Sequence, residues 1–203
     1  LYPPPEGVTD ILGLEFAGTI AETGDRTSGW RVGDRVCALT AGGAYAQRIA
    51  VHTGMLLPLP DDWTFEMGAA VPEVWLTAFS NLFMETGLGA GQTVLIHAGG
   101  SGVGTAAVQL AVAAGATALV TAGSEAKLAR CRELGAALAV NYKTDDFAER
   151  IREFMDGDGV DVILDPIGAP HLAADLKALN PHGRLIHIGI LGGRTAEIDL
   201  GHV

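Results

Sequence analysis

The sequence contains little cysteine and little positive charge, and each shortage excludes a class of protein. Only two cysteines, Cys37 and Cys131, occur in 203 residues, which excludes a disulfide framework and is typical of a reducing compartment. Lysine and arginine number 13 against 24 acidic residues, so the formal net charge is -11 and no basic face for nucleic acid is expected. The first ten residues also lack the basic and apolar pattern of a signal peptide. We expect a cytoplasmic protein that does not bind nucleic acid.

From Thr86 to Ser124 no side chain carries a formal charge, and this stretch is long enough to raise the alternative of a membrane span. His97, Gln109 and a glycine-dense bend divide it into shorter apolar pieces. Short continuous apolar runs are typical of a parallel sheet that is covered on both faces. We therefore favour a covered sheet and expect no membrane partner.

Glycine is in surplus, with 28 residues or about 14% of the chain, against a usual share near 7%. Because 48% of the residues are apolar, the chain can bury a core, and its glycines are expected at tight turns and close backbone contacts. Strand-like runs separated by turn signals predict a β-rich first third. The predicted strands are Glu15–Glu22, Arg35–Leu39 and Ala44–Val51, with an extended piece at Met55–Pro60 and a helical zone from Asp61 to about Met84 that is interrupted at Pro72.

From Gln92 onward, predicted strands alternate with predicted helices. Five strands alternating with four helices predict an α/β fold, a doubly wound parallel sheet of the Rossmann type. We place the boundary between two domains in the helical zone, with the first at 1–72 and the second at 73–203. The predicted strands are Val94–His97, Ala118–Thr121, Leu138–Val140, Val160–Leu164 and Arg184–Ile188, and the predicted helices are Val103–Ala114, Glu125–Leu134, one carrying Phe147, Ile151, Phe154 and Met155, and one carrying Leu172, Leu176 and Leu179.

The segment His-Ala-Gly-Gly-Ser-Gly-Val-Gly, residues 97–104, lies between the first of these strands and its helix. A pyrophosphate is bound by backbone N–H groups, and residues without a side chain allow the main chain to come close enough. A strand before the glycines and a helix after them are the context that a dinucleotide-binding motif requires. The alternative is a glycine-rich turn that binds nothing. The motif predicts cofactor contacts at Gly99, Gly100, Ser101, Gly102, Val103 and Gly104.

The end of the second strand of this alternating region indicates which dinucleotide is bound. A NAD site of this type has an acidic residue there for the ribose 2′-hydroxyl, but this strand ends Thr-Ala-Gly-Ser at residues 121–124. Ser124, with Lys127 and Arg130 in the following helix, would offer a 2′-phosphate a hydroxyl, a helix start and positive charge. The sequence therefore favours NADPH. In the alternative, Ser124 only caps the helix and the two cations are solvated.

A series of motifs runs in order along almost the whole chain: Tyr2–Pro5, Ile11–Glu15, Gly33–Asp34, Pro72–Phe79, Val94–Ala98, Ser101–Ala107, Thr121–Ser124 and Asn141–Lys143. In these motifs the chain resembles the quinone oxidoreductase (zeta-crystallin-like) branch of the medium-chain dehydrogenase/reductase superfamily. Within that branch it is most similar to the tumour-suppressor-inducible quinone oxidoreductase subgroup. The resemblance implies a Rossmann domain preceded by part of a β-rich GroES-like catalytic domain. Enoyl reductases of polyketide synthases share much of the pattern.

The resemblance also implies an NADPH-dependent enzyme that passes a hydride to a small molecule, either a quinone or an α,β-unsaturated carbonyl compound. It places Ser124, Lys127 and Tyr142 around the adenosine 2′-phosphate. It places Thr77, Gly168, Gly189, Ile190 and Leu191 around the nicotinamide. It assigns Tyr2 as the catalytic residue, whose phenol would polarise the substrate carbonyl by donating a hydrogen bond. The alternative for Tyr2 is an aromatic residue at a frayed chain end.

The chain departs from the zinc-dependent relatives of this branch. Those relatives have a histidine between the glycine and the glutamate that stand here as Gly13 and Glu15, whereas this chain has Leu14. A catalytic zinc needs about three protein ligands, and the sequence does not supply them, so we expect a zinc-independent enzyme without a metal site. His97 and His187 lie in predicted strands and are expected to be core histidines.

Members of this branch begin earlier and continue further than this sequence. We therefore expect a chain truncated at both ends, with a Rossmann domain that lacks its last strand. Apolar faces exposed in this way favour a homodimer or a larger homo-oligomer. Two alternatives to a quinone reductase remain, an enoyl-reductase module of a larger synthase and a nucleotide-binding module without turnover. A glycine-loop methyltransferase agrees less well, because its second strand would normally end in an acidic residue.

Overall fold

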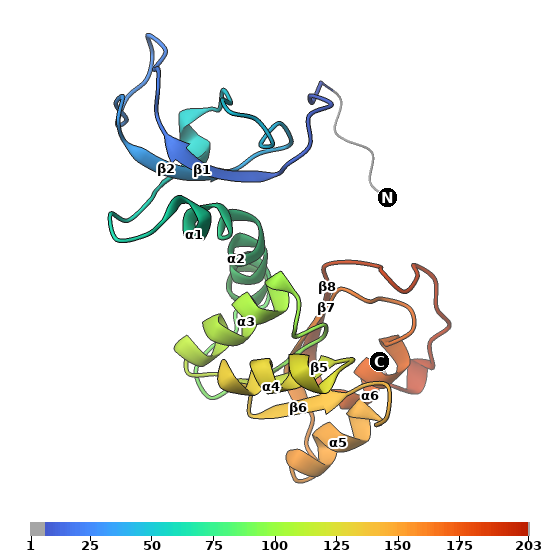
Figure 1. Cartoon of the computed structure of the whole chain (residues 1–203). Coiled ribbons are helices and arrows are strands. Elements are labelled where there is room, and N and C mark those ends of the chain that lie inside the picture. The colour runs from blue at the N-terminus through green and yellow to red at the C-terminus, as the bar shows by residue number, and fades with distance from the viewer. Residues whose placement is uncertain (1–6, 203) are drawn as a thin grey trace. The chain divides into compact units, whose positions relative to one another are not determined.

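A computed structural model of the chain describes residues 7–202, and the chain divides into two compact units between Leu76 and Thr77 (Figure 1). Among the described residues, no helix combines the length and the apolar character needed to cross a membrane. The uncharged stretch from Thr86 to Ser124 instead contains two short strands and one helix, all in the second unit.

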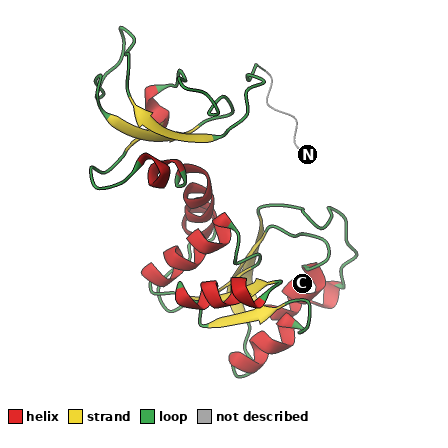
Figure 2. Ribbon diagram, viewed as in Figure 1, coloured by secondary structure: helices red, strands yellow, loops and turns green. Residues whose placement is uncertain are grey.

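The first unit is built on an antiparallel sheet in the order β1-β2-β3 (Figure 2). Its strands are β1 (Glu15–Thr19), β2 (Arg35–Leu39) and β3 (Leu56–Pro58), with a 3-10 turn at Thr53–Met55. Helix α1 (Phe65–Ala69) packs against β1 and β2. It begins after Thr64, whose hydroxyl accepts a hydrogen bond from the Met67 amide at 3.2 Å. The β-rich character predicted for the first third is confirmed.

The strand predicted over residues 44–51 is wrong, because these residues form an irregular loop. The Ala44 amide donates to the Gly13 carbonyl at 3.1 Å, but the pairing does not continue as a strand. Gly13 has a φ of 97° and Gly43 a φ of 87°, and this left-handed backbone interrupts an extended ladder on both sides of the contact.

The second unit contains a parallel five-stranded sheet in the order β6-β5-β4-β7-β8. The chain enters at the central strand β4, moves outward through β5 to β6, and returns to β7 and β8 on the other side of β4. This is the doubly wound α/β sheet that the sequence predicts. Its elements are β4 (Thr93–Ile96), α3 (Gly102–Ala113), β5 (Thr117–Ala122), α4 (Glu125–Glu133), β6 (Leu138–Asn141), α5 (Phe147–Phe154), β7 (Val160–Asp165), α6 (Leu172–Ala178) and β8 (Leu179–His187), preceded by α2 (Pro72–Phe79) and a π-helical turn at Ser80–Glu85, and followed by a 3-10 turn at Leu200–His202.

The core of the second unit lies between the sheet and its helices. Leu95, Leu119 and Ile163 of three neighbouring strands form one buried cluster with Phe147 and Ile151 of α5. Helix α3 packs on β4 and β5, and α4 packs on β5 and β6. Because successive strand residues alternate between the two faces and both are covered, the strands read as continuous apolar runs.

The last predicted helix ends earlier, and the last strand begins earlier, than the sequence indicates. Leu179, predicted to lie on the apolar stripe of the helix, is instead the first residue of β8 and pairs with Val160. The side chain of Asn180 accepts a hydrogen bond from the Gly159 amide at 2.7 Å and donates one to the Gly159 carbonyl at 3.0 Å. These two bonds to a distant segment hold the chain extended where local sequence favours a helix.

Candidate cofactor-binding site

The glycine-rich loop lies at the carboxyl end of the central strand β4, where it leads into α3. Ala98 has a left-handed φ of 50°, and its carbonyl accepts a hydrogen bond from the Ser101 amide at 2.8 Å. Ser101 caps α3 by accepting a hydrogen bond from the Gly104 amide at 3.0 Å. A side chain at Gly104 would collide with the Ala98 carbonyl, so glycine is required for this close packing of helix on loop.

Three backbone amides of this loop, those of Gly100, Gly102 and Val103, have no hydrogen-bond partner within the described part of the chain. The Gly99 amide, in contrast, donates to the Thr121 carbonyl at 2.9 Å. Free amides at the start of a helix carry partial positive charge and are the donors that a phosphate group accepts from. The predicted loop is therefore a cradle with the chemistry that a pyrophosphate requires.

The turn between β5 and α4 brings Ser124 and Lys127 to the same edge of the sheet. Ser124 occupies the N-cap position of α4, but its side chain makes no capping hydrogen bond, so the alternative in which Ser124 only caps the helix is not supported. A Cβ added to Gly100 would lie 2.9 Å from Cβ, Cγ and Cδ of Lys127, which places the stem of this lysine against the loop. Arg130 pairs with Glu133 at 2.9 Å and is engaged there.

Tyr142 follows β6 and lies at the same turn. A Cβ added to Gly123 would lie 2.8 Å from the hydroxyl oxygen of Tyr142. The Tyr142 ring is 44% exposed and packs against the ring of His171, with centroids 5.9 Å apart. The structure thus gathers Ser124, Lys127 and Tyr142 around one turn beside the glycine-rich loop, and their role toward a ligand stays a prediction.

The residues predicted to line the nicotinamide in the last part of the chain lie in two paired loops, after β7 and after β8. The Leu191 amide donates to the Pro166 carbonyl at 3.1 Å. A Cβ added to Gly189 would lie 2.8 Å from the Pro166 carbonyl oxygen, and Gly168 has a left-handed φ of 85°. Ile190 and Leu191 are exposed. Gly168, Gly189, Ile190 and Leu191 therefore lie in neighbouring loops, and their role toward a nicotinamide stays a prediction.

Asp165, the last residue of β7, fixes the first of these loops. Its fully buried carboxylate accepts hydrogen bonds from the amides of Ile167 at 2.6 Å and Gly168 at 2.9 Å. Sequence reasoning missed it, although an acidic residue that ends an apolar strand and precedes Pro-Ile-Gly was a usable signal. His187 contacts the same carboxylate through Nδ1 at 3.0 Å, but its side chain is 40% exposed, so the prediction of a core histidine is wrong there.

Two other predicted residues are not placed at these loops. Thr77 lies in α2, where its carbonyl accepts a hydrogen bond from the Asn81 side chain at 2.8 Å. Tyr2 lies outside the described residues, so its catalytic role stays a prediction.

A buried polar cluster lies at the same end of β4. His97 contacts the Thr121 hydroxyl through Nδ1 and the Asp175 carboxylate through Nε2, both at 2.8 Å, which confirms it as a core histidine. The ring of His171 lies 4.5 Å from that of His97. Within the described residues, Nδ1 of His171 and Oδ2 of Asp175 are buried without a hydrogen-bond partner. Burial, and then the neighbouring His97, lowers the pKa of His171, so its neutral form is favoured.

Metal-binding side chains are dispersed. Among residues 7–202, no three His, Cys, Asp or Glu side chains are grouped closely enough to hold a metal ion. Cys37 and Cys131 are buried free thiols. Burial raises the pKa of both, which favours the protonated thiol over the thiolate that binds metals or attacks substrates.

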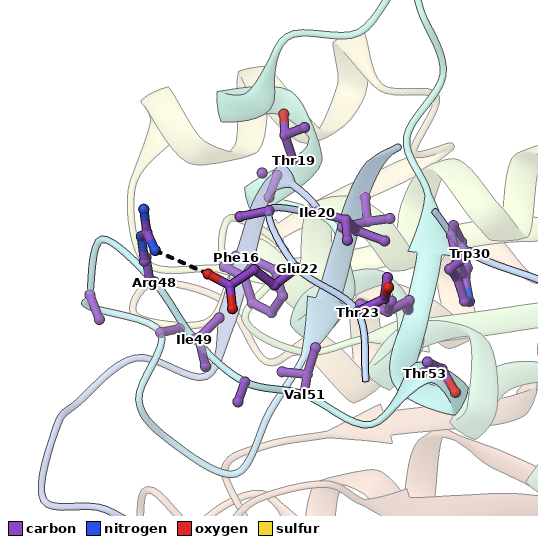
Figure 3. A pocket seen from close by; sticks show the side chains of 18 of the residues that line it. Phe16, Thr19, Ile20, Glu22, Thr23, Trp30, Arg48, Ile49, Val51 and Thr53 are labelled. Carbon is purple, nitrogen blue, oxygen red and sulfur yellow. Dashed lines mark ion pairs between the residues drawn. The ribbon is translucent and has the colours of Figure 1, made fainter. Parts of the chain in front are cut away.

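The first unit has a hollow of its own, lined by β1 and the irregular segment 44–51 (Figure 3). Phe16 and Trp30 contribute aromatic rings to its wall. Glu22 and Arg48 in the lining pair at 3.6 Å, and both side chains are largely exposed. The lining of this hollow mixes polar and apolar side chains.

Comparison with known proteins gives relatives for both units. Residues 2–61 match the family described as alcohol dehydrogenase GroES-like domain, and residues 102–203 match the family described as zinc-binding dehydrogenase. The chain is 42% identical over 180 residues to the spectinabilin polyketide synthase system protein NorB of Streptomyces orinoci, covering 88% of this chain and 8% of that protein.

The chain also resembles solved structures over most of its length, among them an enoyl reductase and a quinone oxidoreductase. The CurK enoyl reductase is 37% identical with a TM-score of 0.84, covering 90% of this chain and 55% of that chain. The Escherichia coli quinone oxidoreductase complexed with NADPH is 31% identical with a TM-score of 0.89, covering 98% of this chain and 61% of that chain. This chain therefore spans less than two thirds of the proteins that it matches. With a GroES-like N-terminal domain followed by a Rossmann-like parallel sheet, the chain belongs to the zinc-binding dehydrogenase family of the medium-chain dehydrogenase/reductase superfamily.

Proposed function

We propose that this chain is part of an NADPH-dependent, zinc-independent oxidoreductase that reduces α,β-unsaturated carbonyl compounds or quinones. The observation that carries the proposal is the set of free amides at Gly100, Gly102 and Val103 with Lys127 beside them. NADPH supplies a hydride when bound, and the protein contributes binding, orientation and hydrogen bonding. The proposal that the enzyme is zinc-independent rests on Leu14, which occupies the position where zinc-dependent relatives have a histidine.

The residues around the glycine-rich loop bind two phosphate groups of the cofactor's adenosine half, the pyrophosphate and the ribose 2′-phosphate. The three free amides bind the pyrophosphate, which bears negative charge at the start of α3. Lys127 and the hydroxyls of Ser124 and Tyr142 bind the adenosine 2′-phosphate. NADH lacks this phosphate and would leave the Lys127 cation uncompensated, so the site prefers NADPH. The Ser124 hydroxyl supports this assignment, because it makes no capping hydrogen bond to α4 and is free to bind a ligand.

The loops after β7 and β8 hold the nicotinamide in this proposal. Asp165 keeps the Gly168 turn in one conformation through its two amide hydrogen bonds. The exposed side chains of Ile190 and Leu191 offer an apolar surface to the ring. Tyr2 donates a hydrogen bond to the substrate carbonyl, and the proton that completes the reduction comes from Tyr2 or from solvent.

Of the two substrate classes, the proposal favours an enoyl thioester. The polyketide synthase protein and the CurK enoyl reductase are 42% and 37% identical to this chain, against 31% for the Escherichia coli quinone oxidoreductase. The quinone is the second candidate, because that same quinone oxidoreductase matches 98% of this chain with a TM-score of 0.89. The relatives named above do not single out the tumour-suppressor-inducible subgroup.

Calorimetric titration of the chain with NADPH and NADH tests the cofactor assignment. We expect NADPH to bind at least about tenfold more tightly, because a charge-assisted contact contributes roughly 1.5–3 kcal/mol. Lys127→Met should remove most of this difference. The matched control is Lys177→Met in α6, an exposed lysine at another place in the unit.

Consumption of NADPH at 340 nm with a crotonyl thioester or with a small quinone then tests the reaction. Turnover of the thioester but not of the quinone would support the enoyl reductase, and the reverse result would support the quinone reductase. NADPH binding without turnover of either substrate, in this chain and in a longer chain that restores the flanking sequence, would instead identify a nucleotide-binding module. Tighter binding of NADH than of NADPH would refute the proposed 2′-phosphate site.

A further inference from the structure

Lys143 follows Tyr142, and both side chains reach the turn after β5. A Cβ added to Gly123 would lie 2.9 Å from Cε of Lys143, in addition to 2.8 Å from the Tyr142 hydroxyl oxygen. Cε bears the ammonium group, so it is the charged end of Lys143 that lies at this turn. Successive residues of a strand point to opposite sides, but β6 ends at Asn141, and the turn that follows brings both side chains to one side.

The turn that carries Lys143 is held by Asn141. The Asn141 side chain accepts a hydrogen bond from the Lys143 amide at 3.1 Å. The Asn141 carbonyl accepts hydrogen bonds from the amides of Thr144 at 3.1 Å and Asp145 at 3.0 Å. These three bonds fix the backbone from which the Lys143 side chain extends.

The carboxylates nearest in sequence to the two lysines are engaged elsewhere. Glu125 pairs with Arg132 at 2.5 Å, and the Asp145 carboxylate accepts a hydrogen bond from the Thr144 hydroxyl at 2.6 Å. Lys127 and Lys143 are exposed and form no ion pair with any described residue. The site thus has two lysines that form no ion pair with a described residue, Lys127 beside Gly100 and Lys143 beside Gly123, and their positive charge favours an anion.

We propose that Lys143 is a specificity-determining residue that binds the adenosine 2′-phosphate as a second cation, in addition to Lys127. A phosphate monoester carries a charge between -1.5 and -2 at pH 7 by its second pKa near 6, so two lysines compensate it where one does not. Gly123 serves the same site, because the absence of a side chain leaves room for the Lys143 and Tyr142 groups to approach the turn. This inference rests on the proposed NADPH-dependent function.

Calorimetry at low ionic strength can compare the binding of 2′,5′-ADP and of 5′-AMP to the full chain. The difference between the two affinities gives the contribution of the 2′-phosphate. We expect Lys143→Met to weaken 2′,5′-ADP binding about tenfold and to leave 5′-AMP binding unchanged, because the two probes differ only in that phosphate. Lys143→Arg, which keeps the charge, should retain most of the affinity. Lys177→Met is the matched control, since Lys127, Lys143 and Lys177 are the three lysines of the chain.

Three results would overturn this inference, and they are distinguishable. If Lys127→Met weakens 2′,5′-ADP binding but Lys143→Met acts no differently from Lys177→Met, Lys143 does not bind the phosphate and the proposed function stands. If the unmodified chain binds 2′,5′-ADP no better than 5′-AMP, the proposed function and this inference fail together. An equal loss of both probes in Lys143→Met would show a general disturbance of the site and would also refute the specific role.

Discussion

The buried pair of His97 and Asp175 allows a quantitative test of how the end of β4 is held. Both side chains are fully buried, and the Nε2–Oδ1 distance is 2.8 Å. Replacing His97 with phenylalanine fills the ring volume but leaves the Asp175 carboxylate, one oxygen of which is already unpartnered, without any hydrogen bond among the described residues. The Thr121 hydroxyl loses its partner as well.

The expected cost is large because a buried carboxyl group that loses its hydrogen-bond partner cannot be solvated. Breaking a buried pair by removing one member costs about 3–5 kcal/mol, against a total stability of roughly 5–15 kcal/mol for a domain. Replacing both members with apolar residues is often nearly neutral. We therefore expect His97→Phe to lose about 3–5 kcal/mol and the double variant His97→Phe with Asp175→Leu to recover at least about 2 kcal/mol of that loss.

Urea unfolding at pH 7 followed by circular dichroism measures the change, and hydrogen exchange of the β4 peptide assigns it to the second unit. The second readout is needed because circular dichroism reports on both units together. The reasoning is refuted if the double variant is as unstable as the sum of its two single variants, because the cost would then come from lost packing and not from a stranded carboxylate.

Three further predictions follow from the loop and from the neighbouring histidine. Gly104→Ala should lower both NADPH affinity and stability, by about 1–3 kcal/mol for the latter, since its Cβ would overlap the Ala98 carbonyl; an unchanged urea midpoint would contradict this. Ser101→Ala should cost about 1 kcal/mol, measured in the same way, because it removes the cap of α3. Burial lowers the pKa of His171 in the folded chain, so below its ordinary value near 6.5 the unfolded chain binds more protons than the folded chain. The free energy of unfolding should therefore fall from pH 6.5 to pH 5, and an equal fall in His171→Phe would assign the effect to other groups.

The parts of the fold that could be predicted depend on local signals. The glycine cluster between β4 and α3 and the alternation of strands and helices predicted the doubly wound sheet. Both signals are local, because apolar periodicity and glycine spacing involve residues that lie close together in the sequence. The end of the last helix could not be predicted in this way. Leu179 leaves the helix because Asn180 bonds to Gly159, a contact that only the assembled structure supplies.

The candidate site shows the same limit at the level of single side chains. Ser124 was predicted to bind the 2′-phosphate, with helix capping alone as the alternative. It lies at the N-cap position of α4, but the sequence could not show that its hydroxyl makes no capping hydrogen bond. Lys143 lies in one of the quoted motifs, but the sequence alone assigned it no role. Its position depends on where β6 ends and on the turn held by Asn141.

The strand order of the second unit has a consequence for the order in which the chain assembles during synthesis. β4 pairs with β5, which follows after one helix, but its other neighbour is β7, and the Thr93 amide bonds to the Asp161 carboxylate 68 residues later. A nascent chain that has emerged only as far as β6 has one side of β4 unpaired and carries the glycine-rich loop on an open sheet edge. Long-range parallel pairing of this kind is slow, and an unpaired strand edge is prone to aggregate. The loop can acquire its final surroundings only after β7 has left the ribosome, so we expect ribosome-associated chaperones to protect the chain mainly before that point.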